Sequence, residues 1–327
     1  MEDGIARQSA GYTPSVWGDY FIKNQAPCSS TTQKTEELMR ERVEELVREV
    51  KNLLDNTYKD ELQSLELIDS LQRLGVGYHF EEEIDKRLRE IHDHNGKIEG
   101  NDLQAVALKF RLLRQHGYNV TSGTRIPRLG ARYYMRVYEQ DKESKNDIVL
   151  ELAMLDFNLL QLLHNEEVKS LSIWWEKIVH DAKFNFSRDR IVECYFWILS
   201  VYFEPQYSMA RKITTKVIAL LSITDDIYDV YGTSDELQSF TDVIIRWDEE
   251  AAQQLKEYLK VHFHNLTKAL QDFDNELSSH GKSYRVKYLK EILKVVVRAW
   301  DEEVKWRDDG YIPALREHLE VSTVTTC

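Results

Sequence analysis

The chain has 327 residues, of which 43 are Lys or Arg and 56 are Asp or Glu, so its formal net charge is −13. The length suits two domains, each with its own core, and the acidic balance argues against a nucleic-acid binder, which needs clustered Lys and Arg. The three cysteines, Cys28, Cys194 and Cys327, give neither a disulfide framework nor a zinc spacing. No apolar run reaches the length that spans a bilayer, and the N-terminus resembles neither a signal peptide nor a transit peptide. We therefore expect a cytoplasmic protein without a membrane span.

Gly and Pro are scarce, and their distribution indicates long helices. Residues 131–204, 206–231, 233–280 and 282–309 contain neither of them and are rich in Leu, Glu, Lys and Arg. We find no two-residue alternation of apolar and polar side chains bounded by hairpin turns. The fold class is therefore predicted to be all-α.

The predicted helices form two groups. After about thirty irregular residues, the first group covers about 34–55, 61–73, 81–93 and 102–115. A loop over residues 119–130 follows, with two glycines and Pro127, and predicts two helical domains at residues 1–123 and 124–327. The helices of the second group are longer and more apolar, and cover about 147–165, 167–180, 187–204, 207–230, 235–244, 249–279 and 283–303.

The end of the predicted helix 207–230 is electrostatically unusual. Its segment Ile213–Thr224 carries one charge in twelve residues, so we expect it to be buried on most sides. Asp225, Asp226 and Asp229 follow, and helical spacing turns all three the same way. Carboxylates at the negative end of a helix dipole repel one another unless a cation shares the site. Because hard divalent cations take carboxylate oxygens, the three aspartates are predicted metal ligands; an exposed acidic turn is the alternative.

The start of the predicted helix 187–204 is unusual in the opposite sense. Ser187 is a suitable N-cap, and Arg188 and Arg190 would lie in the first turn, where the helix dipole is already positive. Guanidinium groups and spare backbone N–H groups together form an anion site, whereas a salt bridge from Arg188 to a neighbouring acid is the alternative. An anion site and a metal site in one aromatic-rich domain fit a metal-bound diphosphate on an apolar substrate.

Several segments match motifs of a known family. Asp225–Asp229 reads DDIYD and follows RDRIVECYFW and YFEPQYSMAR, and Arg7 to Trp17 follows a tandem-arginine-to-tryptophan motif, with Gln8 where a second arginine is usual. Further matching segments are IDSLQRLGVGYHFEEEI, FRLLRQHGYNV, LDFNLLQLLH and DVYGTSDELQSFTDVIIRWD. Together they cover nearly the whole chain, which resembles the plant class I terpene synthases, specifically the cytosolic sesquiterpene cyclases.

The resemblance implies a fold and a metal. Such proteins pair an α-helical N-terminal domain with an α-helical catalytic domain. Mg²⁺, or Mn²⁺ in its place, would be held by Asp225, Asp226 and Asp229. The metal would draw in a prenyl diphosphate, with farnesyl diphosphate favoured because a plastid transit peptide, usual in monoterpene enzymes, is not found.

The resemblance also implies roles for side chains of the anion site. Arg188 and Arg190 would bind the diphosphate and take it up as it leaves. Trp197 would line an aromatic pocket in which the allylic carbocation cyclises, because an aromatic face stabilises a cation by about 2 kcal/mol or more when desolvated. An ordinary core position is the alternative for Trp197.

The sequence departs from the family pattern in two places. The family carries a second metal motif, Asn/Asp-Asp-x-x-Ser/Thr-x-x-x-Glu, downstream of the first, and no segment of this chain fits it. FRLLRQHGYNV is followed almost directly by TRIPRLGARYY, where family members place several helices, so we predict a join near Ser122-Gly123. A skipped exon and an early stop would leave such gaps. Because one metal motif is missing, we expect the chain as given to be weakly active or inactive.

Two other functions stay open. A prenyl diphosphate elongating synthase also uses a DDxxD motif, but it would carry a second aspartate-rich motif and would lack the segment Arg7–Trp17. A non-catalytic protein, such as a truncated pseudoenzyme or splice product, would only bind ligands or fail to fold. The sequence predicts neither the product skeleton nor the oligomeric state.

Overall fold

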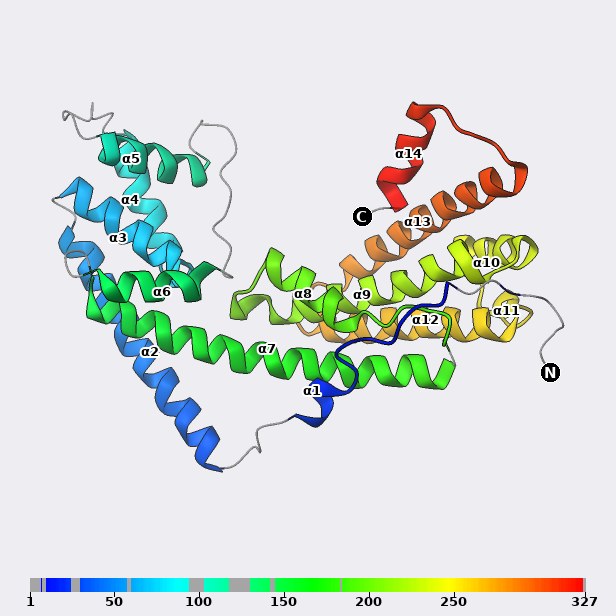
Figure 1. Cartoon of the computed structure of the whole chain (residues 1–327), viewed down its shortest axis with the longest axis horizontal. Coiled ribbons are helices and arrows are strands. Elements are labelled where there is room, and N and C mark those ends of the chain that lie inside the picture. The colour runs from blue at the N-terminus through cyan, green and yellow to red at the C-terminus, as the bar shows by residue number, and fades with distance from the viewer. Residues whose placement is uncertain are drawn as a thin grey trace. The chain divides into compact units, whose positions relative to one another are not determined.

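Helices make up the regular structure of the chain in a computed structural model (Figure 1). The structure describes residue 7 and residues 10–24, 30–57, 60–93, 103–117, 130–141, 145–182 and 184–325. No strand occurs in these ranges, which confirms the predicted all-α class. None of the helices described there is both long and apolar enough to cross a membrane.

The chain divides into two compact units. Unit 1 comprises Met1–Asn24, Glu167–Leu199 and Met209–Cys327, and unit 2 comprises Gln25–Glu166 and Ser200–Ser208. The predicted boundary between residues 123 and 124 and the predicted join at Ser122-Gly123 lie outside the described residues, so both stay predictions. Residues 131–166, which that division assigns to the second domain, belong to unit 2.

Unit 2 surrounds one apolar core. Its helices are α2 (Ser30–Asn56), α3 (Glu61–Arg73), the 3₁₀ turn η2 (Gly77–Phe80), α4 (Glu81–Asp93), α5 (Leu103–Gln115), α6 (Ala131–Gln140) and the first part of α7 (Asp147–Ala182). In α2 the buried side chains recur every three or four residues, as a period of 3.6 requires, at Val43, Leu46, Val50 and Leu54. The Asp60 side chain caps α3 by accepting a 3.1 Å hydrogen bond from the backbone N–H of Gln63.

Helices α3 and α4 have the predicted bounds, whereas α6 was not predicted. Gly130, which precedes α6, makes no capping hydrogen bond with a side chain, so the sequence carries no start signal there. The buried residues Ala131, Met135 and Tyr138 nevertheless keep helical spacing. The apolar stripe of α6 was therefore the only available signal, and it spans just ten residues.

Unit 1 holds the longer and more apolar helices. They are the second part of α7, nearly all of α8 (Ile191–Val201) and α9 (Ser208–Asp226), the π-helical turn η5 (Ile227–Tyr231), α10 (Ser234–Arg246), α11 (Glu249–Ala252), α12 (Glu257–Ser278), α13 (Tyr284–Asp309) and α14 (Leu315–Thr325), with the short turn α1 (Tyr20–Lys23). The short turn η4 (Pro205–Tyr207) belongs to unit 2. Helix α13 packs against α10, α12 and α14. The core of unit 1 is rich in aromatic side chains, among them Trp175, Phe184, Tyr228, Phe240, Phe263, Phe273 and Trp300.

Several predicted helix bounds in this half of the chain were wrong. Residues 147–182 form one helix, because Val168, Leu171 and Trp175 continue its buried stripe without a break. The predicted helix 249–279 is divided into α11 and α12, since the chain turns extended at Lys256 (ψ 148°) before the second of them begins. Helix α14 was not predicted, and it has no buried residue that would have indicated it.

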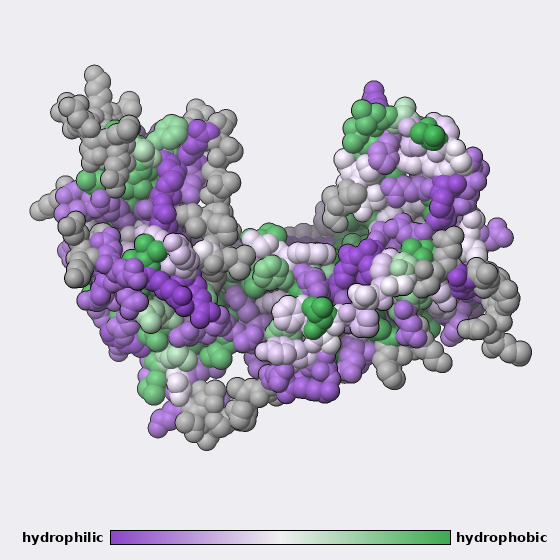
Figure 2. Space-filling view, in the orientation of Figure 1, coloured by the Kyte–Doolittle hydropathy of each residue, from purple (hydrophilic) through white to green (hydrophobic). Residues whose placement is uncertain are grey.

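The first half of α13, and the chain that follows this helix, expose apolar side chains. Figure 2 shows hydrophobic atoms at the surface over α14, and Ile312, Leu315 and Leu319 are exposed there. An apolar stripe on α13 is exposed as well, at Tyr284, Tyr288, Ile292 and Val295. These faces are unusually apolar for a solvated surface.

Candidate functional site

The aspartate motif lies where α9 changes into the π turn η5. Helix α9 ends at Asp226, and a 2.8 Å hydrogen bond from the Gly232 N–H to the Ile227 carbonyl closes the wider turn. A Cβ atom on Gly232 would lie 2.8 Å from Leu237 Cγ, so any larger residue there would force Leu237 to shift. Single π turns within α-helices are frequent at functional sites.

Buried neighbours fix the direction of this helix end. Ala219, Leu220 and Ile223 of α9 and Ile227 and Tyr228 of η5 all lie in the core of unit 1. Because one side of the helix end is thus packed, the aspartates leave from its other side. The apolar character of the segment before the motif predicted this burial correctly.

Asp226 is a fully buried carboxylate with two hydrogen-bond donors and one ion-pair partner. Its side chain is 0% exposed. Its Oδ2 accepts hydrogen bonds from the Ser187 hydroxyl (2.8 Å) and from the Arg188 backbone N–H (2.7 Å), and its Oδ1 lies 2.6 Å from Arg188 Nε. A charge removed from water is stable only when paired in this way. Asp226 is therefore no part of an exposed acidic turn.

Asp225 and Asp229 lie nearer to solvent and are less well compensated. The Asp225 side chain is 29% exposed and accepts a 2.5 Å hydrogen bond from Arg188 Nη2. Burial and then the charge of Asp229 raise the pKa of Asp225, against the opposing effect of Arg188. Asp229 is exposed to solvent. Its pKa is raised too, first by partial loss of hydration and then by the charge of Glu303.

The predicted alternative for Arg188 is not found. Its guanidinium joins Asp225 and Asp226, which are 37 and 38 residues away, and not the neighbouring acids Asp189 and Glu193. The structure thus brings one arginine of the predicted anion site together with two aspartates of the predicted metal motif.

The predicted start of that helix was wrong. Helix α8 begins at Ile191, and its first hydrogen bond runs from the Cys194 N–H to the Arg190 carbonyl (2.8 Å). Ser187 does not cap the helix because its hydroxyl is bound to Asp226. Arg188 and Arg190 therefore precede α8 in a non-helical segment, and do not lie in its first turn.

The structure ties Arg190 and Trp197 less clearly to the aspartate motif than it ties Arg188. Within the described residues Arg190 forms no ion pair with the three aspartates, and it is partly exposed. Trp197 lies on α8 and is 47% exposed, so it is not an ordinary core residue. Their predicted roles stay predictions.

The residues present fit a divalent cation by chemistry, although their geometry is not that of a filled site. Among the described side chains, no group of three or more His, Cys, Asp or Glu residues has the arrangement of a metal centre. Arg188 occupies the place between Asp225 and Asp226. The pKa of Asp225 and of Asp229 is nevertheless raised, first by burial and then by a neighbouring carboxylate, Asp229 and Glu303 respectively, in spite of Arg188. Hard oxygen donors in such surplus suit Mg²⁺.

The N-terminal segment contributes side chains to this region. Arg7 binds Glu236 through two 2.8 Å contacts, and its guanidinium lies 4.7 and 4.9 Å from the ring centres of Tyr231 and Tyr258. The Arg188 guanidinium lies 5.1 Å from the ring centre of Tyr12. Burial and the charge of Asp226 raise the pKa of the Tyr12 hydroxyl. The family motif pointed to Arg7; nothing in the sequence pointed to Tyr12.

Sequence reasoning also missed two side chains of α13. The charge of Glu303 raises the pKa of Asp229. The Glu303 carboxylate also accepts a 3.0 Å hydrogen bond from the Thr325 hydroxyl. Arg307 donates hydrogen bonds to the carbonyls of Tyr228 and Asp229. Both lie more than 70 residues from the motif, so only the packing of α13 brings them near.

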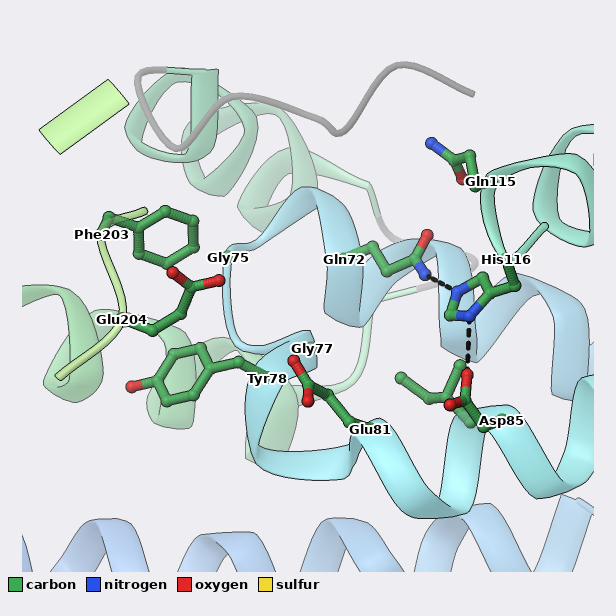
Figure 3. A pocket seen from close by; sticks show the side chains of 11 residues that line it. Gln72, Gly75, Gly77, Tyr78, Glu81, Asp85, Gln115, His116, Phe203 and Glu204 are labelled. Carbon is green, nitrogen blue, oxygen red and sulfur yellow. Dashed lines mark hydrogen bonds and ion pairs between the residues drawn. The ribbon is translucent and has the colours of Figure 1, made fainter. Parts of the chain in front are cut away.

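A separate pocket of about 420 Å³ lies in unit 2 (Figure 3). In it the His116 ring lies between Gln72 (2.8 Å) and Asp85 (2.8 Å). None of the predicted site residues lines this pocket, whose other lining residues are Gly75, Gly77, Tyr78, Glu81, Ile84, Gln115, Phe203 and Glu204.

Two family models match this chain. Residues 16–124 match the terpene synthase N-terminal domain, and residues 176–327 match the metal binding domain of the terpene synthase family. A sesquiterpene synthase of Cananga odorata is 39% identical and covers 98% of this chain and 70% of its own length. The chain belongs to the terpene synthase family.

Other terpene synthases agree with this assignment. An alpha-humulene synthase of Zingiber zerumbet is 41% identical, covering 99% of this chain and 71% of its own length. The crystal structure of isoprene synthase from grey poplar, in complex with three Mg²⁺ ions and dimethylallyl-S-thiolodiphosphate, superposes with a TM-score of 0.77 at 27% identity, over 88% of this chain and 70% of that one.

The alignment with the Cananga relative is longer than this chain, which bears on the predicted internal gap. It is 397 positions long but takes in 98% of the 327 residues, about 320, so about 77 positions pair with no residue of this synthase. Missing internal segments would produce such an excess. The place of the join stays a prediction.

Proposed function

We propose that this terpene synthase ionises farnesyl diphosphate and cyclises the farnesyl cation, which then loses a proton to give a sesquiterpene. The observation that carries the proposal is the contact of Arg188 with Asp225 and Asp226 at the end of α9. It unites a group that binds phosphate oxygens with groups that bind a divalent cation. The names of relatives at 39 and 41% identity support a sesquiterpene product.

Asp225 and Asp229 are the proposed Mg²⁺ ligands, with Mn²⁺ as an alternative ion. Asp226 is the third ligand predicted from the sequence, and Glu303 on α13 adds a carboxylate beside Asp229. When bound, Mg²⁺ supplies positive charge that stabilises the leaving diphosphate.

Arg188 and Arg190 are the proposed ligands of the diphosphate. The bond between the farnesyl C1 atom and the diphosphate oxygen breaks, and its electron pair leaves with the diphosphate. Arg188 and Arg190 donate hydrogen bonds to the oxygens on which negative charge grows, so they stabilise the transition state more than the substrate.

The carbocation needs a dry surface that does not react with it. Trp197 offers an aromatic face, which attracts a cation without forming a bond to it. Water must be kept away because it would capture the cation before cyclisation. We expect this activity in the cytoplasm.

We further propose that the 327-residue chain turns over slowly. No segment of it fits the second metal motif, and fewer metal ligands mean less charge stabilisation as the diphosphate leaves.

Purified chain, incubated with farnesyl diphosphate and Mg²⁺ and analysed by gas chromatography, tests the proposal. Slow, Mg²⁺-dependent release of a sesquiterpene is expected, and turnover as fast as that of full family members would refute the predicted weakness. Adding isopentenyl diphosphate tests the elongating alternative, for which a longer prenyl diphosphate is the diagnostic product. Thermal melting with Mg²⁺ and pyrophosphate tests the non-catalytic alternative, because a ligand of the folded state raises the midpoint.

A further inference from the structure

The backbone carbonyls of the π turn η5 bind two arginines from distant parts of the chain. Arg307 Nη1, on α13, donates to the carbonyls of Tyr228 (3.1 Å) and Asp229 (3.2 Å). Arg7 Nη1 donates to the carbonyl of Tyr231 (3.2 Å). The turn that carries Asp229 is thus held through its main chain, from two sides, by side chains of other elements.

These carbonyls need donors because the helix ends here. The last carbonyl groups of a helix have no further turn of N–H groups to bind, and the chain leaves the turn at Gly232 in an extended conformation (ψ 144°). The same carbonyls form the negative end of the helix dipole, and they lie beside the carboxylates of Asp225 and Asp229. Without the arginines, the turn would combine unsatisfied acceptors with clustered negative charge.

We propose that Arg307 is a positioning residue for the metal-binding turn. By binding the carbonyls of Tyr228 and Asp229, it fixes the direction in which the Asp229 side chain leaves the backbone. The inference rests on the proposed function, since it requires Asp229 to be a metal ligand. Arg307 itself touches neither metal nor substrate in this role.

Arg307 is a better test of this role than Arg7. Arg7 also binds Glu236 and lies against two tyrosine rings, so its loss would disturb more than the turn. Arg307 is 46% exposed, and its ion-pair partner is its neighbour Asp308, at 3.3 Å. A substitution there removes chiefly the two bonds to the turn.

Positioning and simple charge predict effects of opposite sign. A guanidinium near Asp229 repels a metal ion, so removal of its charge alone would tighten metal binding. Removal of two hydrogen bonds that orient the turn would weaken it. The sign of the change therefore separates the two roles.

The experiment is calorimetric titration of the 327-residue chain with Mg²⁺ at saturating inorganic pyrophosphate. Because each lost hydrogen bond has a modest net effect, we expect Arg307→Gln to weaken binding by about tenfold. Arg307→Lys, which keeps the charge and can donate to both carbonyls, should restore binding to within about threefold. Arg298→Gln, an exposed position on the same helix, is the matched control and should leave it unchanged.

A spectroscopic readout distinguishes positioning from a general structural role. The electron paramagnetic resonance spectrum of Mn²⁺, bound with pyrophosphate, should change in Arg307→Gln and stay unchanged in Arg298→Gln. The unfolding midpoint without ligand should fall by no more than about 3 °C, since two hydrogen bonds from a side chain that is 46% exposed contribute little. A fall above about 10 °C with loss of all binding would make Arg307 a general structural residue and overturn the proposal.

The remaining outcomes separate this inference from the proposed function. Unchanged or tighter Mg²⁺ binding in Arg307→Gln, while the unsubstituted chain binds, overturns the positioning role alone. A lack of binding by the unsubstituted chain overturns the proposed function and this inference together. Weaker binding in Arg307→Gln that Arg307→Lys restores supports both.

Discussion

Replacing Arg188 with Gln removes the cation that this structure places inside the aspartate motif. The Asp226 carboxylate, which is 0% exposed, loses its 2.6 Å ion pair but keeps hydrogen bonds from Ser187 (2.8 Å) and from the main chain (2.7 Å). Asp225 loses its 2.5 Å partner, but it is 29% exposed and can bind water instead.

These contacts set the expected magnitude. Breaking a fully buried ion pair costs about 3–5 kcal/mol. The two hydrogen bonds that remain on Asp226, and the access of water to Asp225, reduce this to about 2–3 kcal/mol. For a chain of 327 residues, whose unfolding entropy is correspondingly large, that corresponds to a fall of about 3–5 °C in the unfolding midpoint.

Differential scanning calorimetry measures the change, with Arg190→Gln as the matched control. Arg190→Gln removes the same charge two residues away and, within the described residues, breaks no pair with the aspartates, so its midpoint should move by less than about 2 °C. Mg²⁺ and pyrophosphate should raise the unfolding midpoint of both variants by less than they raise that of the unsubstituted chain. Equal midpoints for the two variants would refute the reasoning that Arg188 is the internal partner of a buried aspartate.

Three further predictions concern other parts of unit 1. Arg211 and Glu167 form a buried ion pair at 2.8 Å. Arg211→Met should therefore lower the free energy of unfolding in urea by about 3–5 kcal/mol, and adding Glu167→Leu should recover most of that loss. A double variant no more stable than the single one would argue against the pair. Gly232→Ala should destabilise by about 1–3 kcal/mol because the new methyl group meets Leu237, as chemical denaturation would show. Burial opposes ionisation of Glu236, but hydrogen bonds, above all from Arg7, lower its pKa to about 2. Its contribution to stability, about 1–2 kcal/mol after screening by solvent, should be complete above about pH 4.5 and vanish as the pH falls to about 2; an unchanged acid-denaturation profile in Glu236→Gln would contradict this.

The helical architecture could be predicted from sequence because it depends on local rules. Scarce Gly and Pro marked long helices, and the glycines at 75 and 77 after α3 and the Asn95-Gly96 pair after α4 made the ends of these two helices readable. Helices α6 and α14 escaped prediction because the first is short and lacks a capping side chain, while the second buries nothing.

Only the part of the candidate site that lies at the end of one helix could be predicted from the sequence. An apolar helix that runs into Asp225, Asp226 and Asp229 implied a site through residue types and their spacing alone. The π form of the turn and the pairing of Arg188 with two of these aspartates were not readable, because both depend on packing between segments nearly 40 residues apart. The approach of Glu303 and Arg307 depends on α13 in the same way.

The most direct test is thermal melting of the unsubstituted chain and of Asp225→Asn and Asp229→Asn, each with and without Mg²⁺ and pyrophosphate. The control is Asp272→Asn, the same substitution at an exposed position on α12. We predict a clear upward shift for the unsubstituted chain and the control, by about 2–3 kcal/mol of added stability when the ligand exceeds its dissociation constant a hundredfold. The shift should be lost in both site variants. Equal shifts in all four proteins would contradict a diphosphate site built on the aspartates at the end of α9.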